Sequence, residues 1–154
     1  MFREMRRTKQ YLPEEECIEI LKNATSGVLA VSGDDDYSYA VPLSYAYDDG
    51  KIIGGAYGST DDGYWCHLKL LFVDADYRGQ DIATQLLQMV ENFAIERRCV
   101  GIRVETWSFQ ARGFYEKLGF TLYGQLDDHP PTATEYLLKK VLIANPEDFP
   151  KPIV

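Results

Sequence analysis

The stretch 71–87, LFVDADYRGQDIATQLL, passes abruptly from the pattern of a buried strand to that of a helix. Its apolar run ends at Val73, an acidic turn follows, and helical spacing begins directly after Arg78 and Gly79. A helix N-terminus presents unpaired backbone N–H groups and partial positive charge, which together favour anions. Arg78 adds a cation, and Gly79 allows the backbone to approach a bound group closely. On these residues alone two interpretations stay open: a cradle for a diphosphate, or a tight connection without a ligand.

The sequence around this turn predicts an α/β (α+β) fold with a mixed sheet, because strand patterns alternate with helical ones. A long strand is expected at 64–73, a helix from Gly79 to about Arg98, and another strand at 100–107. Two strands joined through a helix in one sheet are expected to be parallel, with a right-handed crossover. This unit is the predicted centre of the domain.

The segments after residue 107 predict a second helix and two more strands. The helix is expected at 108–119, with Ser108 as its N-cap and Gly119 as its C-terminal glycine. The strands are expected at 120–126 and 134–142.

The N-terminal third predicts a short helix near 12–23 and a strand at 26–32. Asp49 and Gly50 lie between alternating residues, which is a strong hairpin signal. Pro42, in the first arm of that hairpin, favours an edge position or a bulge because proline has no N–H for the ladder.

Length and composition limit the classes of function. The 154 residues favour one domain over 1–154, with an atypical N-terminal segment 1–52 and an irregular tail 143–154. The formal net charge of -8 disfavours binding to nucleic acid, whose phosphates such a surface repels. No apolar run approaches the roughly 18 residues of a membrane span, and no signal-peptide apolar region follows the N-terminus.

The three cysteines are Cys17, Cys66 and Cys99, and their spacing matches neither a metal site nor a disulfide framework. Each is expected to be a small buried side chain. An odd, widely spaced set favours a reducing cytoplasm as the location of the protein.

Two motifs in order carry a specific resemblance. LLFVDADYRGQDIATQLL (70–87) followed by SFQARGFYEKLGF (108–120) resembles the GNAT family of N-acetyltransferases, over about residues 40–142. The coenzyme motif of the family, Q/R-x-x-G-x-G/A, falls on Arg78, Asp81 and Ala83. The resemblance implies a splayed central sheet, acetyl-CoA as co-substrate and no metal.

The resemblance also implies which residues bind acetyl-CoA. Backbone amides of the motif loop would hold the diphosphate, and the backbone of the central strand would pair with the pantetheine arm. The implied set is Leu71, Phe72, Val73, Arg78, Gly79, Gln80, Asp81, Ile82, Ala83 and Ser108.

Asp81 departs from the family pattern, which has glycine at this position. A carboxylate near a diphosphate is electrostatically adverse. Aspartate nevertheless suits the first turn of a helix, where its side chain can face solvent while its N–H faces the phosphate.

Tyr115 matches the frequent general acid of the family, which protonates the leaving thiolate. The alternative is an aromatic packing position on the helix. A general base must take a proton from the substrate ammonium, and Glu105 is the first candidate, ahead of His67, Asp74 and His129. The implied reaction is direct acetyl transfer to a primary amine of a small molecule or peptide.

The segment 13–52 resembles the start of flavin-binding split-barrel proteins of the nitroimidazole-resistance and pyridoxamine-phosphate-oxidase class. Two alternative functions follow: an acyl-CoA-binding domain without catalysis, and a flavin-dependent redox protein. The strand at 26–32 is also expected to be able to pair with a second chain at a sheet edge, which would give a homodimer.

Overall fold

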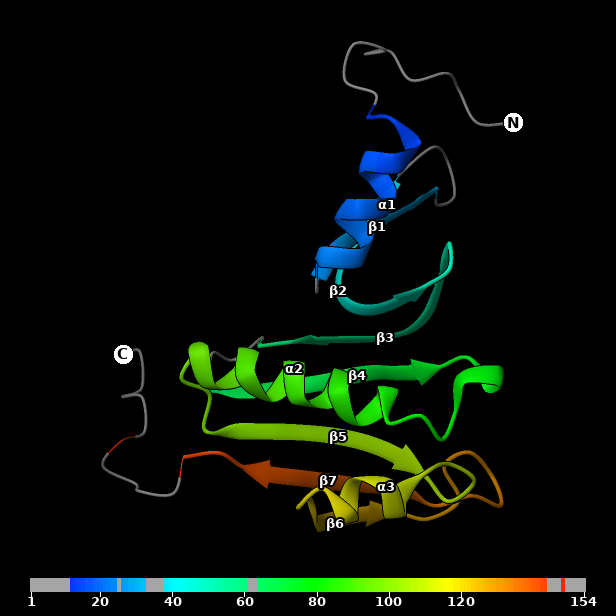
Figure 1. The fold of residues 1–154 in the computed structure, drawn as a ribbon. Helices are drawn as coiled ribbons and strands as arrows, with labels where there is room; N and C mark the ends of the chain where they lie inside the picture. Colours follow the sequence, from blue (N-terminus) through cyan, green and yellow to red (C-terminus); the bar gives the residue numbers. More distant parts are fainter. Residues whose placement is uncertain (1–11, 25, 33–37, 61–63, 144–147, 149–154) are drawn as a thin grey trace.

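The computed structural model describes residues 12–24, 26–32, 38–60, 64–143 and 148, which form a seven-stranded sheet with helices (Figure 1). In chain order the elements are α1 (Glu14–Asn23), β1 (Ser26–Ser32), β2 (Ser38–Asp48), β3 (Lys51–Ser59), β4 (Trp65–Val73), the 3-10 helix η3 (Ala75–Tyr77), α2 (Ile82–Glu96), β5 (Gly101–Trp107), α3 (Arg112–Lys117), β6 (Thr121–Leu126) and β7 (Glu135–Val141).

The sheet is mixed, as the sequence predicts, with the strand order β1-β2-β3-β4-β5-β7-β6. Neighbouring strands are antiparallel except for β4 and β5, which pair in parallel. The predicted parallel unit around α2 is therefore confirmed. β1 lies at one edge of the sheet, as its predicted pairing with a second chain requires. The pairing itself stays a prediction.

β4 and β5 pair only at their first residues, from Trp65 opposite Gly101 to Leu68 opposite Val104. The register between β3 and β4 shifts near this point, since Gly58 pairs with Leu68 while Tyr57 pairs with Leu70. Lys69 is thus an extra residue in β4, and such a bulge bends its strand. β5 continues in register with β7 as far as Trp107, so the two parallel strands diverge toward their C-terminal ends.

The core lies between the sheet and the helices on one face, where α2 crosses β3 and β4 (Figure 1). The buried residues of α2 recur at helical spacing: Leu86, Leu87, Val90 and Ala94. They pack in one cluster with side chains of β4, β5 and β7 that include Leu68, Ile102 and Leu138. This packing holds the N-terminus of α2 beside the diverging strands.

The hairpin turn at Asp49-Gly50 is confirmed, with φ of 39° and 82° at its two central residues. Pro42 lies in the part of β2 that pairs with β1, and the pairing of β2 with β3 begins at Ser44. At residue 42, β2 therefore has a neighbouring strand on one side only, which is the edge-like position that the sequence predicts for proline.

The prediction that each cysteine is buried is wrong for Cys17. This residue lies in α1, which buries none of its residues, and its side chain is exposed. Cys66 and Cys99 are buried, as expected. Most of the predicted tail at 143–154 lies outside the described residues.

Candidate active site

The connection between β4 and α2 forms a small cleft of about 230 Å³. Gln85 N–H donates to the Asp81 carbonyl (3.0 Å), which is the first hydrogen bond of α2. The preceding amides at 82–84 therefore have no partner within the helix and remain for an anion. The cleft is lined by Val73, Tyr77, Arg78, Gly79, Asp81, Ile82, Ala83, Thr84 and Phe114.

Two residues in this loop have left-handed backbone conformations. Gly79 has φ of 78° and Asp81 has φ of 59°. The helix begins at Ile82, so the prediction that places Asp81 in the first turn is wrong: it is the N-cap residue, and its side chain makes no capping hydrogen bond. The conformation explains why this position suits glycine, and why aspartate, which tolerates left-handed geometry better than most residues, replaces it.

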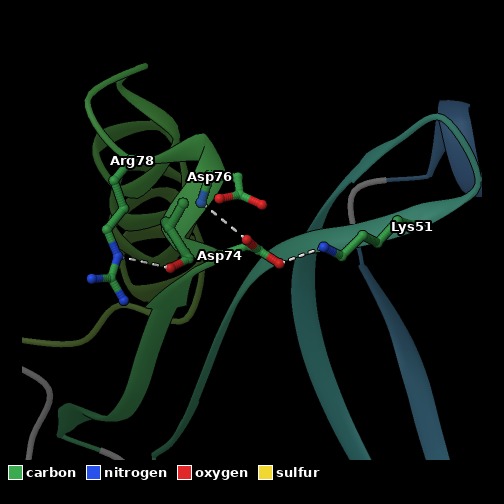
Figure 2. A network of polar contacts seen from close by, with 5 residues as sticks. Lys51, Asp74, Asp76 and Arg78 are labelled. Carbon is green, nitrogen blue, oxygen red and sulfur yellow. Dashed lines mark hydrogen bonds and ion pairs between the residues drawn. The ribbon is translucent and has the colours of Figure 1, made fainter.

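A network of polar contacts braces the start of the loop (Figure 2). The Asp74 carboxylate pairs with Lys51 Nζ (2.5 Å) and accepts a hydrogen bond from Asp76 N–H (3.1 Å). Hydrogen bonding to Lys51 is the main cause that lowers the pKa of Asp74. Arg78 Nε donates to the Val73 carbonyl (3.2 Å), at the end of β4. Asp74 is therefore engaged in a structural ion pair and does not line either cleft, which argues against it as the general base.

A larger cleft of about 670 Å³ opens where β4 and β5 diverge. Its lining includes Leu71, Phe72, Val73, Glu105 and Tyr115, all of them residues singled out in the sequence. Val73, Arg78, Ala83 and Phe114 line both clefts, so the two adjoin. The arrangement offers an anion site at one end and a slot between strands that leads away from it.

Tyr115 is buried in α3, and its ring packs edge-on against Phe114 and Phe120. The helix ends with φ of 89° at Gly119, where Gly119 N–H donates to Glu116 and Phe120 N–H donates to Tyr115. Within the described residues the Tyr115 hydroxyl has no hydrogen-bond partner. Burial raises the pKa of Tyr115, so its phenol stays protonated.

Glu105 lies on β5 beside His67 of β4, with 3.0 Å between Glu105 Oε2 and His67 Nε2. Arg103 Nη1 lies 3.7 Å from the other carboxylate oxygen. Glu105 lines the larger cleft, whereas His67 does not and instead contacts Glu105 from outside it. His129 lies in the β6–β7 loop and lines neither cleft. Of the four candidate bases, only Glu105 is therefore placed on the cleft.

The structure does not bring Gln80 and Ser108 to either cleft. Ser108 is not the N-cap that the sequence predicts, because α3 begins at Arg112. The Ser108 hydroxyl instead accepts a hydrogen bond from Thr134 N–H (3.2 Å), which ties the end of β5 to the loop before β7.

The sequence did not single out Trp107, Phe109 and Gln110, which also line the larger cleft. The rings of Trp107 and Phe109 stack with 6.4 Å between centroids, and Trp107 Nε1 is buried with no hydrogen-bond partner among the described residues. Gln110 Oε1 accepts a hydrogen bond from the buried Thr106 hydroxyl (3.1 Å). The available signal was their position, with Trp107 at the end of the predicted strand and Phe109 and Gln110 just after it.

Neither a membrane-crossing helix nor a cluster of metal ligands is found in the described part of the chain. No helix there is long and apolar enough to cross a membrane. No cluster of three or more histidine, cysteine, aspartate or glutamate side chains within the same ranges is arranged to hold a metal ion.

The chain is similar in sequence to known proteins. The sequence model of the Acetyltransferase (GNAT) family matches residues 2–120. This range includes the segment 13–52, whose resemblance to flavin proteins stays a prediction. The chain is 42% identical over 94 residues to the blasticidin-S acetyltransferase of Streptomyces morookaense, a match that covers 60% of this chain and 68% of that protein.

Solved structures share the fold. An acetyltransferase from Bacillus cereus superposes with a TM-score of 0.56 at 29% identity, covering 83% of this chain and 84% of that one. An aminoglycoside 6'-N-acetyltransferase complexed with coenzyme A superposes with a TM-score of 0.63 at 18% identity, covering 85% and 81%. The chain therefore belongs to the acetyltransferase (GNAT) family and is an acetyl-CoA-dependent acetyltransferase of the GNAT type.

Proposed function

We propose that this chain transfers the acetyl group of acetyl-CoA directly to a primary amine, with Tyr115 as general acid and Glu105 as general base. One observation carries the proposal: both side chains line the slot between β4 and β5, and this slot adjoins the loop of unpaired amides through Arg78. An acid, a base and an anion site thus share one continuous cleft.

The loop would bind the coenzyme diphosphate through the amides at 82–84 and through the charge of Arg78. The pantetheine arm would lie along β4, where Leu71, Phe72 and Val73 line the slot and strand β5 has moved away. The backbone N–H and C=O groups of β4 that do not pair with β5 can then form hydrogen bonds with the amide groups of the arm. Binding of this kind depends on the backbone and on the divergence of the strands.

Tyr115 is suited to protonate the leaving thiolate. Its hydroxyl has no competing partner among the described residues, and its raised pKa keeps the proton on the phenol until the thiolate forms. The neighbouring rings of Phe114 and Phe120 hold the side chain in place and exclude water around it. These contacts favour a catalytic role over packing alone, although Tyr115 also belongs to the core.

Glu105 is suited to take the proton of the acceptor ammonium, directly or through water. Its side chain is 31% exposed and reaches the cleft, while that of His67 is 14% exposed. His67 fixes the orientation of the carboxylate by its contact at 3.0 Å. His67 is accordingly a positioning residue in this proposal.

The acceptor is proposed to be a small cationic amine with a flat or apolar part. Glu105 favours a cation, and the stacked rings of Trp107 and Phe109 offer a flat apolar surface next to it. The relative at 42% identity is named for blasticidin S, which makes that compound the first acceptor to test.

The test is acetyl-dependent release of coenzyme A thiol over a panel of amines that includes blasticidin S, aminoglycosides and short peptides. Turnover with at least one amine, lost in Tyr115→Phe, is the expected result. Binding of coenzyme A without turnover on any amine would favour the alternative of a non-catalytic acyl-CoA-binding domain, to which the carboxylate of Asp81 at the anion site points. A purified protein that carried bound flavin would instead favour the redox alternative.

A further inference from the structure

We infer that the Lys51–Asp74 ion pair positions the coenzyme loop, a role that rests on the proposed function. The loop has little apolar burial to hold it in place. η3 contains no buried residue, and Arg78, Gly79 and Gln80 are all exposed. Its position therefore depends on a few polar contacts.

Asp74 gathers three of these contacts just after β4, and Figure 2 shows the two that its carboxylate makes. Its N–H donates to the Ile53 carbonyl (2.8 Å), and its Oδ1 accepts from Asp76 N–H (3.1 Å). Its Oδ2 pairs with Lys51 Nζ (2.5 Å). Lys51 is the first residue of β3, directly after the β2–β3 hairpin turn. The same ammonium lies 5.8 Å from the centroid of the Tyr77 ring, in the last position of η3. Lys51 thus ties both ends of η3 to the hairpin.

Arg78 continues these contacts into the clefts. Its Nε donates to the Val73 carbonyl, one residue before Asp74, while its side chain lines both clefts. A shift of η3 would move Arg78 and the amides that follow it relative to β4. Fixing them before the coenzyme arrives lowers the ordering cost of binding. Lys51 and Asp74 therefore act through the loop, without contact to the coenzyme.

A purely electrostatic role for this pair makes the opposite prediction for one variant. If Lys51 only neutralised the Asp74 charge, Asp74→Asn would remove a carboxylate near the diphosphate and would strengthen binding. If the pair positions the loop, Asp74→Asn weakens binding, although the asparagine oxygen can still accept the bond from Asp76 N–H. Asp74→Asn separates the two roles.

The experiment measures coenzyme A binding by calorimetry, together with kcat and KM for acetyl-CoA. Lys51→Met and Asp74→Asn should each weaken binding by about threefold to fivefold, as expected for a partly exposed ion pair. The double variant should be no weaker than the single ones, and kcat at saturating acetyl-CoA should change little. Lys51→Arg keeps the charge and should restore binding.

Lys140→Met is the matched control. It breaks an ion pair of the same length, Lys140 Nζ to Glu91 Oε1 at 2.5 Å, which joins β7 to α2 away from the loop. This variant should lose stability but bind coenzyme A like the wild type.

Three outcomes would overturn the inference: wild-type binding in Lys51→Met, stronger binding in Asp74→Asn, or an equal loss of binding in Lys140→Met. In each of these cases the wild type still binds coenzyme A, and the proposed function stands. A wild-type chain that bound no coenzyme A would remove the proposed function and this inference together.

Discussion

The imidazole of His67 and the carboxylate of Glu105 meet at 3.0 Å across β4 and β5, near the last residues at which these strands pair in parallel. The contact joins the two strands just before they diverge. It also sets the direction of the carboxylate that lines the cleft. In the proposed mechanism, a base held in this way loses little orientational freedom when the acceptor binds.

Glu105→Gln should lower kcat by about a hundredfold, because the amide cannot accept the ammonium proton. His67→Gln should cost less, about threefold to tenfold, since it removes only the contact that orients the base. Steady-state kinetics with saturating acetyl-CoA measures both. Glu116→Gln is the control, because that carboxylate pairs with Arg112 on the exposed side of α3. Unchanged kcat in Glu105→Gln would remove this residue from the mechanism.

Tyr115→Phe should lower kcat by about a hundredfold or more and leave KM for acetyl-CoA nearly unchanged, because only the proton donor is lost. Burial raises the pKa of Tyr115, so the acid form persists above the ordinary phenol value of about 10. Any fall in wild-type activity caused by ionisation of Tyr115 should accordingly lie above pH ~10. Tyr123→Phe, on an exposed position of β6, is the control. Equal losses in the two variants would show that the phenol of Tyr115 is not the acid.

Replacing Asp81 should separate its charge from its backbone conformation. Asp81→Gly and Asp81→Asn both tolerate φ of 59°, and both remove the carboxylate beside the amides that are proposed to bind the diphosphate. Each should bind coenzyme A more tightly, by about twofold to fivefold at low salt. Asp81→Ala also removes the charge but has a left-handed cost of roughly 1 kcal/mol, visible as lower stability in urea. If both neutral variants bound more weakly than the wild type, the carboxylate would itself be part of the site.

Sequence patterns predicted the sheet and the parallel unit because these depend on periodicity, and a short motif indicated the loop that is proposed to bind the coenzyme. The divergence of β4 from β5 was accessible only through family resemblance, since the extra residue Lys69 has no local signature. Helix starts were the main error. Gly79 and Asp81 both have positive φ, which delays α2, and Ser108 bonds to Thr134, a partner remote in sequence. Such contacts are set by tertiary structure.

The same limit applies to the site. Glu105 was ranked as a base from its place at a strand end, but its contact with His67 depends on the register of two strands. Trp107 and Phe109 were not singled out, because their place in the lining of the larger cleft follows from where β5 ends. A motif search finds the loop that is proposed to bind the coenzyme, whereas the residues of the proposed acceptor side come together only once the strands are placed in space.

The cysteines should react very differently with an alkylating reagent at pH ~8. Cys17 is exposed, whereas burial, with a smaller contribution from Cys99, raises the pKa of the Cys66 thiol to about 11. Intact-protein mass spectrometry should therefore show rapid labelling of Cys17 in the native protein, and labelling of Cys66 and Cys99 only after unfolding. Cys17→Ser should abolish the rapid phase. Fast native labelling of Cys66 would mean that the packing between β4 and α2 is open in solution.

Two glycines should respond oppositely to alanine. A Cβ on Gly101 would collide with the Lys140 carbonyl oxygen and would lie 2.6 Å from Cζ3 of Trp65, where β5 is paired on both sides. Since backbone and a ring must both shift, Gly101→Ala should lower the free energy of unfolding by about 3 kcal/mol or more. A Cβ on Gly113 of α3 would instead point into open space, so Gly113→Ala should raise that free energy by about 0.5–1 kcal/mol through helix propensity. Urea denaturation of both variants measures these changes in the free energy of unfolding. A Gly101→Ala variant as stable as the wild type would show that β5 is less tightly enclosed than its register with β4 and β7 requires.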